Sequence, residues 1–241
     1  MKYKNAIIIT GPTTTGKTRT ALEAAKRFNG EIINSDRLYI YSSLKIGSGL
    51  SNILQYSDII RHLYEIRKLD ESLTTDEYIT LVETLVPKIL SRNKLPIIEG
   101  CSSTYNPALM KCNKMKSRIF YYSPVIALRW PEGTDLRNKI EKRLTKMFNN
   151  GLLQEAKLIY NKGFRNAHPI KISVVYNPLM EYFDSKITLR KAKEEIINKW
   201  LEVYQLQLET FEKIPEIIWI ESDKNKNKST LKQVIEVIEK Y

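Results

Sequence analysis

The stretch from Gly11 to Thr18, with the sequence GPTTTGKT, constrains the fold of this chain more than any other feature. It follows the apolar run AIII at residues 6–9 and precedes a segment at 19–28 that is rich in Ala, Leu, Glu and Lys. A strand, a glycine-bounded loop ending in Gly-Lys-Thr and a helix, in that order, are typical of a phosphate-binding loop. The sequence therefore predicts a strand–loop–helix unit that opens a parallel α/β sheet.

Backbone chemistry indicates what such a loop binds. The glycines let the chain curl so that successive amide N–H groups point at an anion, and the dipole of the following helix adds to that field. Lys17 supplies a mobile positive charge, and the Thr18 hydroxyl is placed to ligate Mg²⁺. We expect a di- or triphosphate to bind to the residues of this loop, namely Gly11, Pro12, Thr13, Thr14, Thr15, Gly16, Lys17 and Thr18.

Composition limits the classes of protein that remain. The chain has 241 residues, of which 42% are hydrophobic, with only nine Gly and nine Pro, so it is long and apolar enough for a globular core. Lys and Arg number 39 against 27 Asp and Glu, a net charge of +12. This excess suits an anionic substrate and would also suit nucleic acid, although scattered lysines equally fit a solvated surface.

Cysteine usage and hydropathy bear on location. Cys101 and Cys112 have neither metal-ligand spacing nor a disulfide pattern, which favours a reducing compartment. The phosphate loop starts within ten or so residues of the first Met, leaving no room for a signal sequence, and no stretch is long enough to span a membrane. We expect a cytoplasmic protein without membrane contact. Its oligomeric state is left open, with a monomer as the default.

The remaining pattern alternates short apolar runs with amphipathic segments. We expect strands at 5–10, 31–34, 96–99, 118–122 (with 125–130 extending or following it) and 216–221. We expect helices at 17–28, 75–90, 135–149, 152–161, 188–211 and 229–241. A capping box at Thr74-x-x-Glu77 opens the helix at 75–90, whose apolar positions are Tyr78, Leu81, Leu85 and Ile89, and we expect a hydrophilic loop at 223–228. The predicted fold is α/β, a parallel sheet like that of P-loop NTPases, flanked by helices and with a helix-rich C-terminal half. We treat 1–241 as a single domain with a helical appendage over roughly 135–213 packed on the sheet.

Ligands of such sheets bind outside the carboxyl ends of the strands. Asp36 follows the strand at 31–34, and Ser102 follows the strand at 96–99, so both should face the phosphate loop. The Asp36 carboxylate has three candidate roles: helix cap, Mg²⁺ ligand or general base. In the helix at 135–149, Arg143 lies closest to the apolar face, so we expect it to point at a ligand while Lys139 and Lys146 face solvent.

These residues resemble the isopentenyltransferase family that prenylates adenine, which comprises adenylate isopentenyltransferases (cytokinin synthases) and tRNA dimethylallyltransferases. The resemblance is good over roughly residues 5–160 and looser afterwards. It is carried by GPTTTGKT and by a series of further positions: Ser35-Asp36, Tyr41, IGSG at 46–49, Arg61-His62-Leu63, 74–78, EGCS at 99–102, Tyr105, Lys139-Ile140, Arg143, Met147, Gly151-Leu152 and Glu155.

The resemblance implies a reaction. The phosphate loop would hold dimethylallyl diphosphate, and the exocyclic amine of adenine would attack its allylic carbon while pyrophosphate leaves. By its matching position, Asp36 would be the general base and Thr13 would reach the bridging oxygen. Ser48 would help to hold the adenine edge. Pyrophosphate would be stabilised by Lys17, by Arg143 and by Mg²⁺ at Thr18.

The acceptor is the open question at this stage. The resemblance implies that tRNA enzymes carry a sizeable insertion after the strand at 96–99, whereas here only a dozen residues separate Tyr105 from 118. Tyr39 stands where those enzymes carry Gln, no Lys-Pro follows Gly49, and 204–211 keeps little of their pattern. We therefore expect a free adenine nucleotide as acceptor, AMP before ADP or ATP, as in the first step of cytokinin biosynthesis, and tRNA as an unlikely partner. The alternatives are a tRNA dimethylallyltransferase, a small-molecule or nucleoside kinase, and a non-enzymatic nucleotide switch or RNA-binding module.

The donor is predicted from the stretches at 173–175 and 200–203, which are mostly apolar. An unpaired hydroxyl against apolar walls is disfavoured, so we expect dimethylallyl diphosphate and not a hydroxylated prenyl donor.

Overall fold

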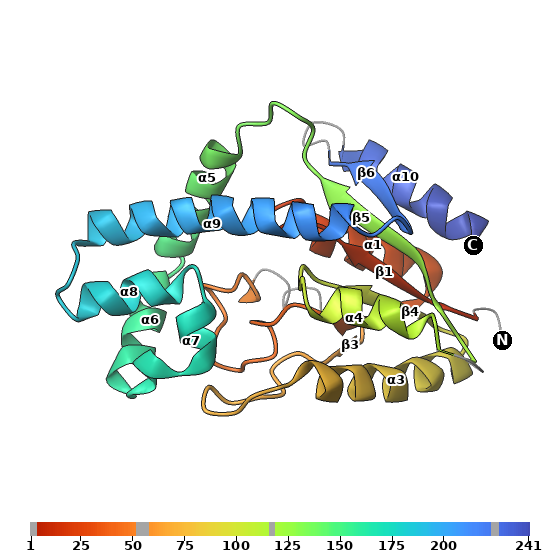
Figure 1. The fold of residues 1–241 in the computed structure, drawn as a ribbon, viewed down its shortest axis with the longest axis horizontal. Helices are drawn as coiled ribbons and strands as arrows, with labels where there is room; N and C mark the ends of the chain where they lie inside the picture. The colour runs from red at the N-terminus through yellow and green to blue at the C-terminus, as the bar shows by residue number, and fades with distance from the viewer. Residues whose placement is uncertain (1–3, 52–57, 116–118, 223–226) are drawn as a thin grey trace.

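A computed structural model describes residues 4–51, 58–115, 119–222 and 227–241. Its centre is a sheet of six parallel strands in the order β3-β2-β4-β1-β5-β6 (Figure 1). The strands are β1 (Ala6–Thr10), β2 (Gly30–Asn34), β3 (Arg61–His62), β4 (Leu95–Glu99), β5 (Tyr122–Arg129) and β6 (Ile217–Glu221). The predicted α/β fold with a parallel sheet is confirmed.

Helices cover both faces of this sheet and extend beyond one end of it (Figure 1). They are α1 (Lys17–Phe28), α3 (Thr75–Ser91), α4 (Tyr105–Cys112), α5 (Leu136–Asn149), α6 (Leu152–Asn161), α7 (His168–Ile172), α8 (Tyr176–Phe183), α9 (Leu189–Glu212) and α10 (Asn227–Lys240), with a 3₁₀ turn at Phe164–Asn166. In the view of Figure 1 the helices from α5 to α8 gather on the left, and α9 runs from them back to the sheet. The division into one domain with an appendage over 135–213 stays a prediction.

Strand β1 shows why the sheet is buried on both faces. Ile7 and Ile9 belong to the apolar cluster formed with α1 and α10, whereas Ile8 belongs to the larger cluster formed with α3, α4 and α9. Successive residues of a strand point to opposite faces, so a continuous apolar run needs cover on both sides. All five residues of β1 are buried, as the sequence predicted.

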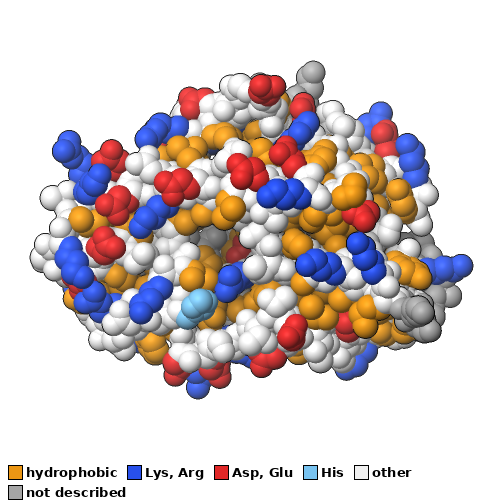
Figure 2. All heavy atoms as spheres, in the orientation of Figure 1, with side chains coloured by type: hydrophobic (Ala, Val, Ile, Leu, Met, Phe, Trp, Pro, Cys, Tyr) orange, Lys and Arg blue, Asp and Glu red, His pale blue; other side chains and the backbone are white. Residues whose placement is uncertain are grey.

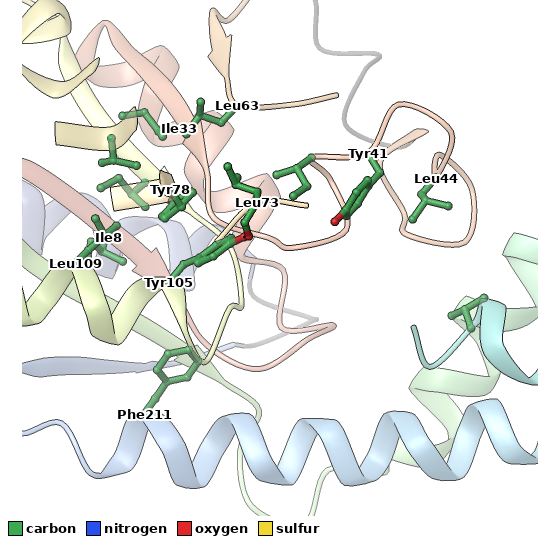
Figure 3. Close-up of a cluster of buried hydrophobic side chains, with 14 of the residues drawn as sticks. Ile8, Ile33, Tyr41, Leu44, Leu63, Leu73, Tyr78, Tyr105, Leu109 and Phe211 are labelled. Carbon is green, nitrogen blue, oxygen red and sulfur yellow. The ribbon is translucent and has the colours of Figure 1, made fainter. Parts of the chain in front are cut away.

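Two stacked tyrosines support the edge of the sheet where β2 ends. The rings of Tyr78 on α3 and Tyr105 on α4 lie 4.0 Å apart and nearly parallel (Figure 3). The Tyr78 hydroxyl donates to the carbonyl of Asn34, and the Tyr105 hydroxyl donates to the carbonyl of Leu73. Buried tyrosines are stable when the hydroxyl has such a partner. Because Asn34 directly precedes Ser35 and Asp36, this packing fixes the start of the turn that carries Asp36.

Most of the predicted boundaries match. Helix α1 covers the predicted residues and ends at Asn29 in the left-handed conformation, and the predicted capping box at Thr74 opens α3. One detail of α3 differs: Val82 and Val86 are fully buried, whereas Leu81 and Leu85, which the periodicity placed inward, are only partly buried. The buried stripe is rotated because α3 packs on both β4 and α4.

The strand predicted at 118–122 is wrong in its placement. The structure has one strand, β5, over Tyr122–Arg129, which takes up the segment expected at 125–130; Arg118 lies outside the described residues. Pro124 interrupts the sequence pattern because proline has no N–H to donate. The ladder continues past it through a shift in register between Ala6 and Ile8 on β1. Of the loop predicted at 223–228, residues 223–226 lie outside the described residues and α10 begins at Asn227.

No helix in the described ranges combines the length and the apolar character that crossing a bilayer requires.

The loop at 45–49 is held in place by a single carboxylate from α6. Glu155 accepts hydrogen bonds from the backbone N–H groups of Lys45, Ile46 and Gly47 at 2.9–3.1 Å. The hydroxyl of Tyr176 also donates to this carboxylate. A Cβ at Gly47 would lie 2.5 Å from the Tyr176 ring, so only glycine fits there. Glu155 thus positions the segment that carries Ser48.

We expect Glu155→Ala to lower the free energy of unfolding by about 3 kcal/mol, because it leaves three backbone donors without their charged acceptor. Glu155→Gln keeps one acceptor oxygen, so it should lower the free energy of unfolding by less. Urea denaturation measures both. Gln154→Ala, at the exposed neighbouring position, serves as the control and should unfold like the wild type. Equal stability of Glu155→Ala and the control would contradict this account.

Candidate active site

A cavity of about 640 Å³ lies at the carboxyl ends of β1, β2 and β4. Its walls come from the phosphate loop, the turns after β2 and β4, the loop at 47–49, α5, the segment between α7 and α8, and α9. Figure 2 shows a hollow near the middle of the molecule, with Lys, Arg and His side chains beside it. The cavity thus opens at the strand edge where the sequence predicted ligand binding.

Most of the predicted site residues line this cavity, although they come from distant parts of the chain. They are Thr13, Thr14, Gly16, Lys17, Thr18, Asp36, Ser48, Ser102 and Arg143. Gly11, Pro12 and Thr15 are not among the lining residues. Gly11 has a packing role instead, because its φ is 123° and a Cβ there would lie 2.1 Å from the carbonyl oxygen of Leu128 on β5. The Thr15 hydroxyl donates to the carbonyl of Pro12 at 2.9 Å and so closes the loop.

The phosphate loop contains polar groups that use only part of their hydrogen-bonding capacity within the described part of the protein. The ammonium of Lys17, 6% exposed, donates to the carbonyl of Pro12 at 3.1 Å. Thr14 has a positive φ of 70°, and its buried Oγ1 has no hydrogen-bond partner in the part of the chain that the structure describes. A buried polar atom without a partner costs free energy. Such groups around Gly16 and Lys17 suit an anionic ligand.

Glu99, at the end of β4, is a cavity residue that the sequence analysis did not select. Its Oε1 accepts the Thr18 hydroxyl at 2.8 Å, while its buried Oε2 has no hydrogen-bond partner among the described residues. Burial raises the pKa of Glu99 to about 7, although Lys17 and the Thr18 hydroxyl act in the opposite direction. Its position could have signalled a role, because it ends a strand at the same edge as Asp36.

Thr18 and Glu99 fit a divalent cation. They offer a hydroxyl and an unpartnered carboxylate oxygen side by side, which are hard oxygen ligands. Within the described ranges no group of three His, Cys, Asp or Glu side chains could hold a metal by itself. Mg²⁺ usually takes one or two protein ligands and completes its coordination shell with substrate phosphates and water.

Asp36 points into the cavity from the turn after β2. Its Oδ1 accepts the N–H of Leu38 at 2.9 Å, and its Oδ2 accepts the thiol of Cys101 at 3.0 Å. Burial, reinforced by the Asp36 charge, raises the pKa of Cys101 to about 12, so the thiol remains a donor. The Asn34 side chain bonds both the N–H and the carbonyl of Asp36. Asp36 therefore caps a turn with one oxygen and presents a fixed carboxylate to the cavity.

The hydroxyls of Ser48 and Ser102 already make hydrogen bonds within the protein. Ser48 donates to the carbonyl of Leu44 and accepts the N–H of Leu50. Ser102 accepts the N–H of Tyr105 at 3.0 Å and so begins α4. Both residues line the cavity; contact of Ser48 with adenine and of Ser102 with the substrate stay predictions.

Arg143 reaches the cavity from α5, as its place on the helix predicted. Its guanidinium lies over the ring of Trp200 at 5.2 Å and donates to the carbonyl of Ser48 at 3.4 Å. Lys146, which we expected to face solvent, is exposed and also lines the cavity, and Arg19 joins them from α1. Lys139 instead lies 3.7 Å above the ring of Trp130. The cavity thus has more cations than the sequence analysis assigned to it.

Gln207 on α9 is a further cavity residue that was missed. Its Oε1 accepts the N–H of Thr13 at 2.9 Å, and its Nε2 donates to the carbonyl of Cys101 at 3.0 Å. The sequence held one signal, because Gln207 is a polar residue in the buried stripe of α9 between Tyr204 and Phe211. Its partner lies 194 residues away, so the contact itself could not be read from the chain.

The fold and the cavity together place a phosphate loop and several polar side chains at the carboxyl edge of a parallel sheet. The sequence profile of the IPP transferase family matches residues 39–118 and 111–213. This chain belongs to the IPP transferase family and is therefore a prenyltransferase. The family match supports the predicted prenyl transfer over the kinase and the non-enzymatic alternatives.

Curated relatives and solved structures agree with this assignment. The chain is 26% identical to a tRNA dimethylallyltransferase of Anoxybacillus flavithermus, with 80% of this chain and 82% of the relative covered. It is 27% identical to one of Streptococcus thermophilus, with 81% and 83% covered. A full-length tRNA isopentenylpyrophosphate transferase of Bacillus halodurans has the same fold, with a TM-score of 0.84 at 21% identity over 99% of this chain and 98% of that one. The structure of a tRNA delta(2)-isopentenylpyrophosphate transferase of Staphylococcus epidermidis has a TM-score of 0.87 at 20% identity, with 99% of both chains covered.

The prediction that tRNA is an unlikely partner is wrong. The relatives reported above are all named for action on tRNA, and the assignment to the adenylate branch of the family has no support. The prediction rested on a short connection after β4 and on single residues such as Tyr39. The family match at 39–118 and 111–213 runs through both of these features, so neither excludes a tRNA acceptor.

The buried carboxyl of Glu99 should make stability depend on pH. Its pKa is raised from 4.5 to about 7, so between these values the folded protein keeps a proton that the unfolded chain releases. The contribution of Glu99 to the free energy of unfolding therefore falls by about 3 kcal/mol as the pH rises from 5 to 8. Glu99→Gln removes this titration, so the free energy of unfolding of the variant should rise relative to that of the wild type between pH 5 and pH 8.

Urea denaturation at pH 5 and pH 8, without added Mg²⁺, measures the effect. Glu132→Gln, at an exposed position, is the control and should follow the wild type at both pH values. If the free energies of unfolding of the wild type and Glu99→Gln changed with pH in parallel, the pKa of Glu99 would not be raised in the folded protein.

Proposed function

We propose that this protein transfers a dimethylallyl group from dimethylallyl diphosphate to the exocyclic amine of an adenosine in tRNA. The observation that carries the proposal is the cavity in which the Asp36 carboxylate and the phosphate loop face each other. Curated relatives named tRNA dimethylallyltransferase, aligned over about four fifths of this chain, support the choice of acceptor.

In this proposal the diphosphate of the donor lies in the phosphate loop. Lys17 exchanges the carbonyl of Pro12 for the phosphate oxygens, and Arg143 swings from the weak 3.4 Å contact with Ser48 to the leaving group. Negative charge grows on pyrophosphate as the allylic C–O bond breaks, and preorganised cations stabilise that charge. Thr13 lies in the same wall, where its hydroxyl can donate to the bridging oxygen.

Asp36 would accept the proton that the exocyclic amine loses when it forms the new C–N bond. This amine is a weak nucleophile because its lone pair is delocalised into the adenine ring. A positioned base contributes typically ~10²–10⁴-fold to such a reaction. The hydrogen bonds from Leu38 and Cys101 hold the Asp36 carboxylate in one orientation, as a general base requires.

We further propose that Thr18 and Glu99 hold Mg²⁺ together with the donor diphosphate. Bound Mg²⁺ would neutralise part of the charge of the leaving pyrophosphate. Cation binding would also draw Glu99 into its ionised form, which burial alone disfavours.

The prenyl tail would lie against the apolar side of the cavity. Leu38, Val174, Val175, Trp200, Val203 and Leu206 line that part of the wall. A hydroxyl on the tail would find few partners there, so we propose dimethylallyl diphosphate as the donor over its hydroxylated analogue.

A free adenine nucleotide is the second candidate acceptor, and one observation favours it. The alignment with the Anoxybacillus relative covers 258 positions, more than the length of this chain, yet it takes in only 80% of this chain. The relative therefore has segments without a counterpart here. The family profile also matches in two parts that meet at 111–118, in the connection between α4 and β5. A shorter chain has less surface with which to grip a folded RNA.

An acceptor assay decides between the two. We expect the purified protein with Mg²⁺ and dimethylallyl diphosphate to add one five-carbon group to unmodified tRNA, and to do so with a higher kcat/KM than with AMP, ADP or ATP. Mass spectrometry of the nucleosides from digested tRNA and of the free nucleotides gives the result. A higher kcat/KM with AMP would establish the second candidate, and phosphoryl transfer without prenylation would reject both.

Asp36→Asn should lower kcat by ~10²–10⁴-fold while the affinity for dimethylallyl diphosphate changes little, because the amide keeps the shape but is not a base. Single-turnover rates and calorimetric titration of the donor measure the two quantities. Asp70→Asn, at an exposed position, is the matched control and should leave both unchanged. Turnover by Asp36→Asn at the wild-type rate would remove Asp36 from the role of base.

A further inference from the structure

Arg37 lies at the boundary between the active-site cavity and a second, smaller cavity. It lines both, as does Ile172 at the end of α7. The second cavity has a volume of about 240 Å³ and is also lined by Tyr41, Tyr105 and His168. A group held by Arg37 would therefore lie at the edge of the active site, with open space on either side.

The charge of Arg37 is not neutralised within the described part of the chain. Its Nη2 contacts Nε2 of His168 at 3.3 Å, and it forms no ion pair with a carboxylate. A guanidinium has only donors, so the imidazole must be the acceptor in this contact. Burial raises the pKa of the Tyr105 hydroxyl and the Arg37 charge lowers it, which places the guanidinium close to that hydroxyl as well. Arg37 thus has several donors and a full positive charge available to a ligand.

The cations of the active-site cavity come from three elements. Lys17 and Arg19 belong to α1, and Arg143 and Lys146 belong to α5. Arg37 comes from the turn after β2 and is the one Lys or Arg that the described residues contribute to the second cavity. A single diphosphate in the loop does not account for this additional cation.

The geometry of the acceptor suggests what Arg37 binds. In an adenosine nucleotide the exocyclic amine and the 5′-phosphate lie at opposite ends of the molecule. When the amine meets Asp36 inside the cavity, the phosphate must lie toward solvent. His168 is exposed and Arg37 is half-buried, so the pair stands where the cavity opens.

We propose that Arg37, with His168 beside it, binds the phosphate attached to the 5′-oxygen of the target adenosine. Arginine suits this role because its planar fork can donate two parallel hydrogen bonds to phosphate oxygens. The same phosphate is a diester in RNA and a monoester in AMP. This inference rests on the proposed function for the position of the adenine amine, but it holds for either acceptor.

The test removes the charge on each side of the contact in turn. For RNA, the substrate is an anticodon stem-loop with either the natural phosphodiester or a neutral methylphosphonate 5′ to the target adenosine; a methylphosphonate on the 3′ side is the substrate control. For the free nucleotide, AMP is compared with adenosine. The protein variants are Arg37→Met, Arg37→Lys and His168→Ala, with Lys171→Gln as the control that removes a charge from α7 outside both cavities.

In the wild type we expect the neutral substrate of the preferred pair to bind ~10–100-fold more weakly than the charged one. Arg37→Met should weaken the charged substrate by a similar factor, leave the neutral one unchanged, and leave the KM for dimethylallyl diphosphate at the wild-type value. Arg37→Lys should recover part of the loss, and His168→Ala should show a smaller one. Equilibrium dissociation constants give these numbers even where turnover is slow.

Two results would overturn the proposal. One is a wild-type protein that binds the charged and neutral substrates of both pairs equally well. The other is an Arg37→Met variant that weakens charged and neutral substrates alike, which would mark Arg37 as a structural residue. Prenylation of AMP without prenylation of RNA would reject the tRNA acceptor and still leave the phosphate contact decided by the pair of AMP and adenosine.

Discussion

The active site depends on one bridge between distant parts of the chain, the side chain of Gln207. Its two hydrogen bonds join the N–H of Thr13 in the phosphate loop to the carbonyl of Cys101 after β4, and its backbone belongs to α9. Cys101 in turn donates its thiol to Asp36. The Gln207 amide therefore links the loop proposed to hold the donor to the carboxylate proposed to act as base, in addition to the sheet that joins β1, β4 and β2.

The electrostatics of the cavity follow from this arrangement. Two carboxylates, Asp36 and Glu99, line the same cavity as Lys17, and burial raises the pKa of Glu99 to about 7 although Lys17 lowers it. Additional cations line the same cavity from α1 and α5. Such a site favours a multiply charged anion bound together with a divalent cation. The cation would bind the unpartnered Oε2 of Glu99, and the anion would offset the excess positive charge of the Lys and Arg side chains.

The sequence predicted the elements that depend on local chemistry. The phosphate loop, the capping box at Thr74 and the buried strands carry their signals within a few residues, so their boundaries were correct to within a residue or two. Residues whose role arises from contacts across the chain were missed: Gln207 pairs with a loop 194 positions away, and the pKa of Glu99 is raised by burial in the folded protein although Lys17 and Thr18 lower it. The strand at Tyr122–Arg129 was misplaced because a proline hides a ladder that continues through a shift in register.

The acceptor was misjudged for a related reason. The chemistry of prenyl transfer concerns the diphosphate, the allylic carbon and the exocyclic amine, and these are the same for a free nucleotide and for tRNA. Residues at the strand edge therefore specify the reaction but not the size of the molecule that carries the adenine. Selection of a large acceptor depends on surface beyond the cavity. The segments of the Anoxybacillus relative that have no counterpart here would therefore affect how firmly an RNA acceptor is held, whereas the residues at the strand edge would determine the reaction.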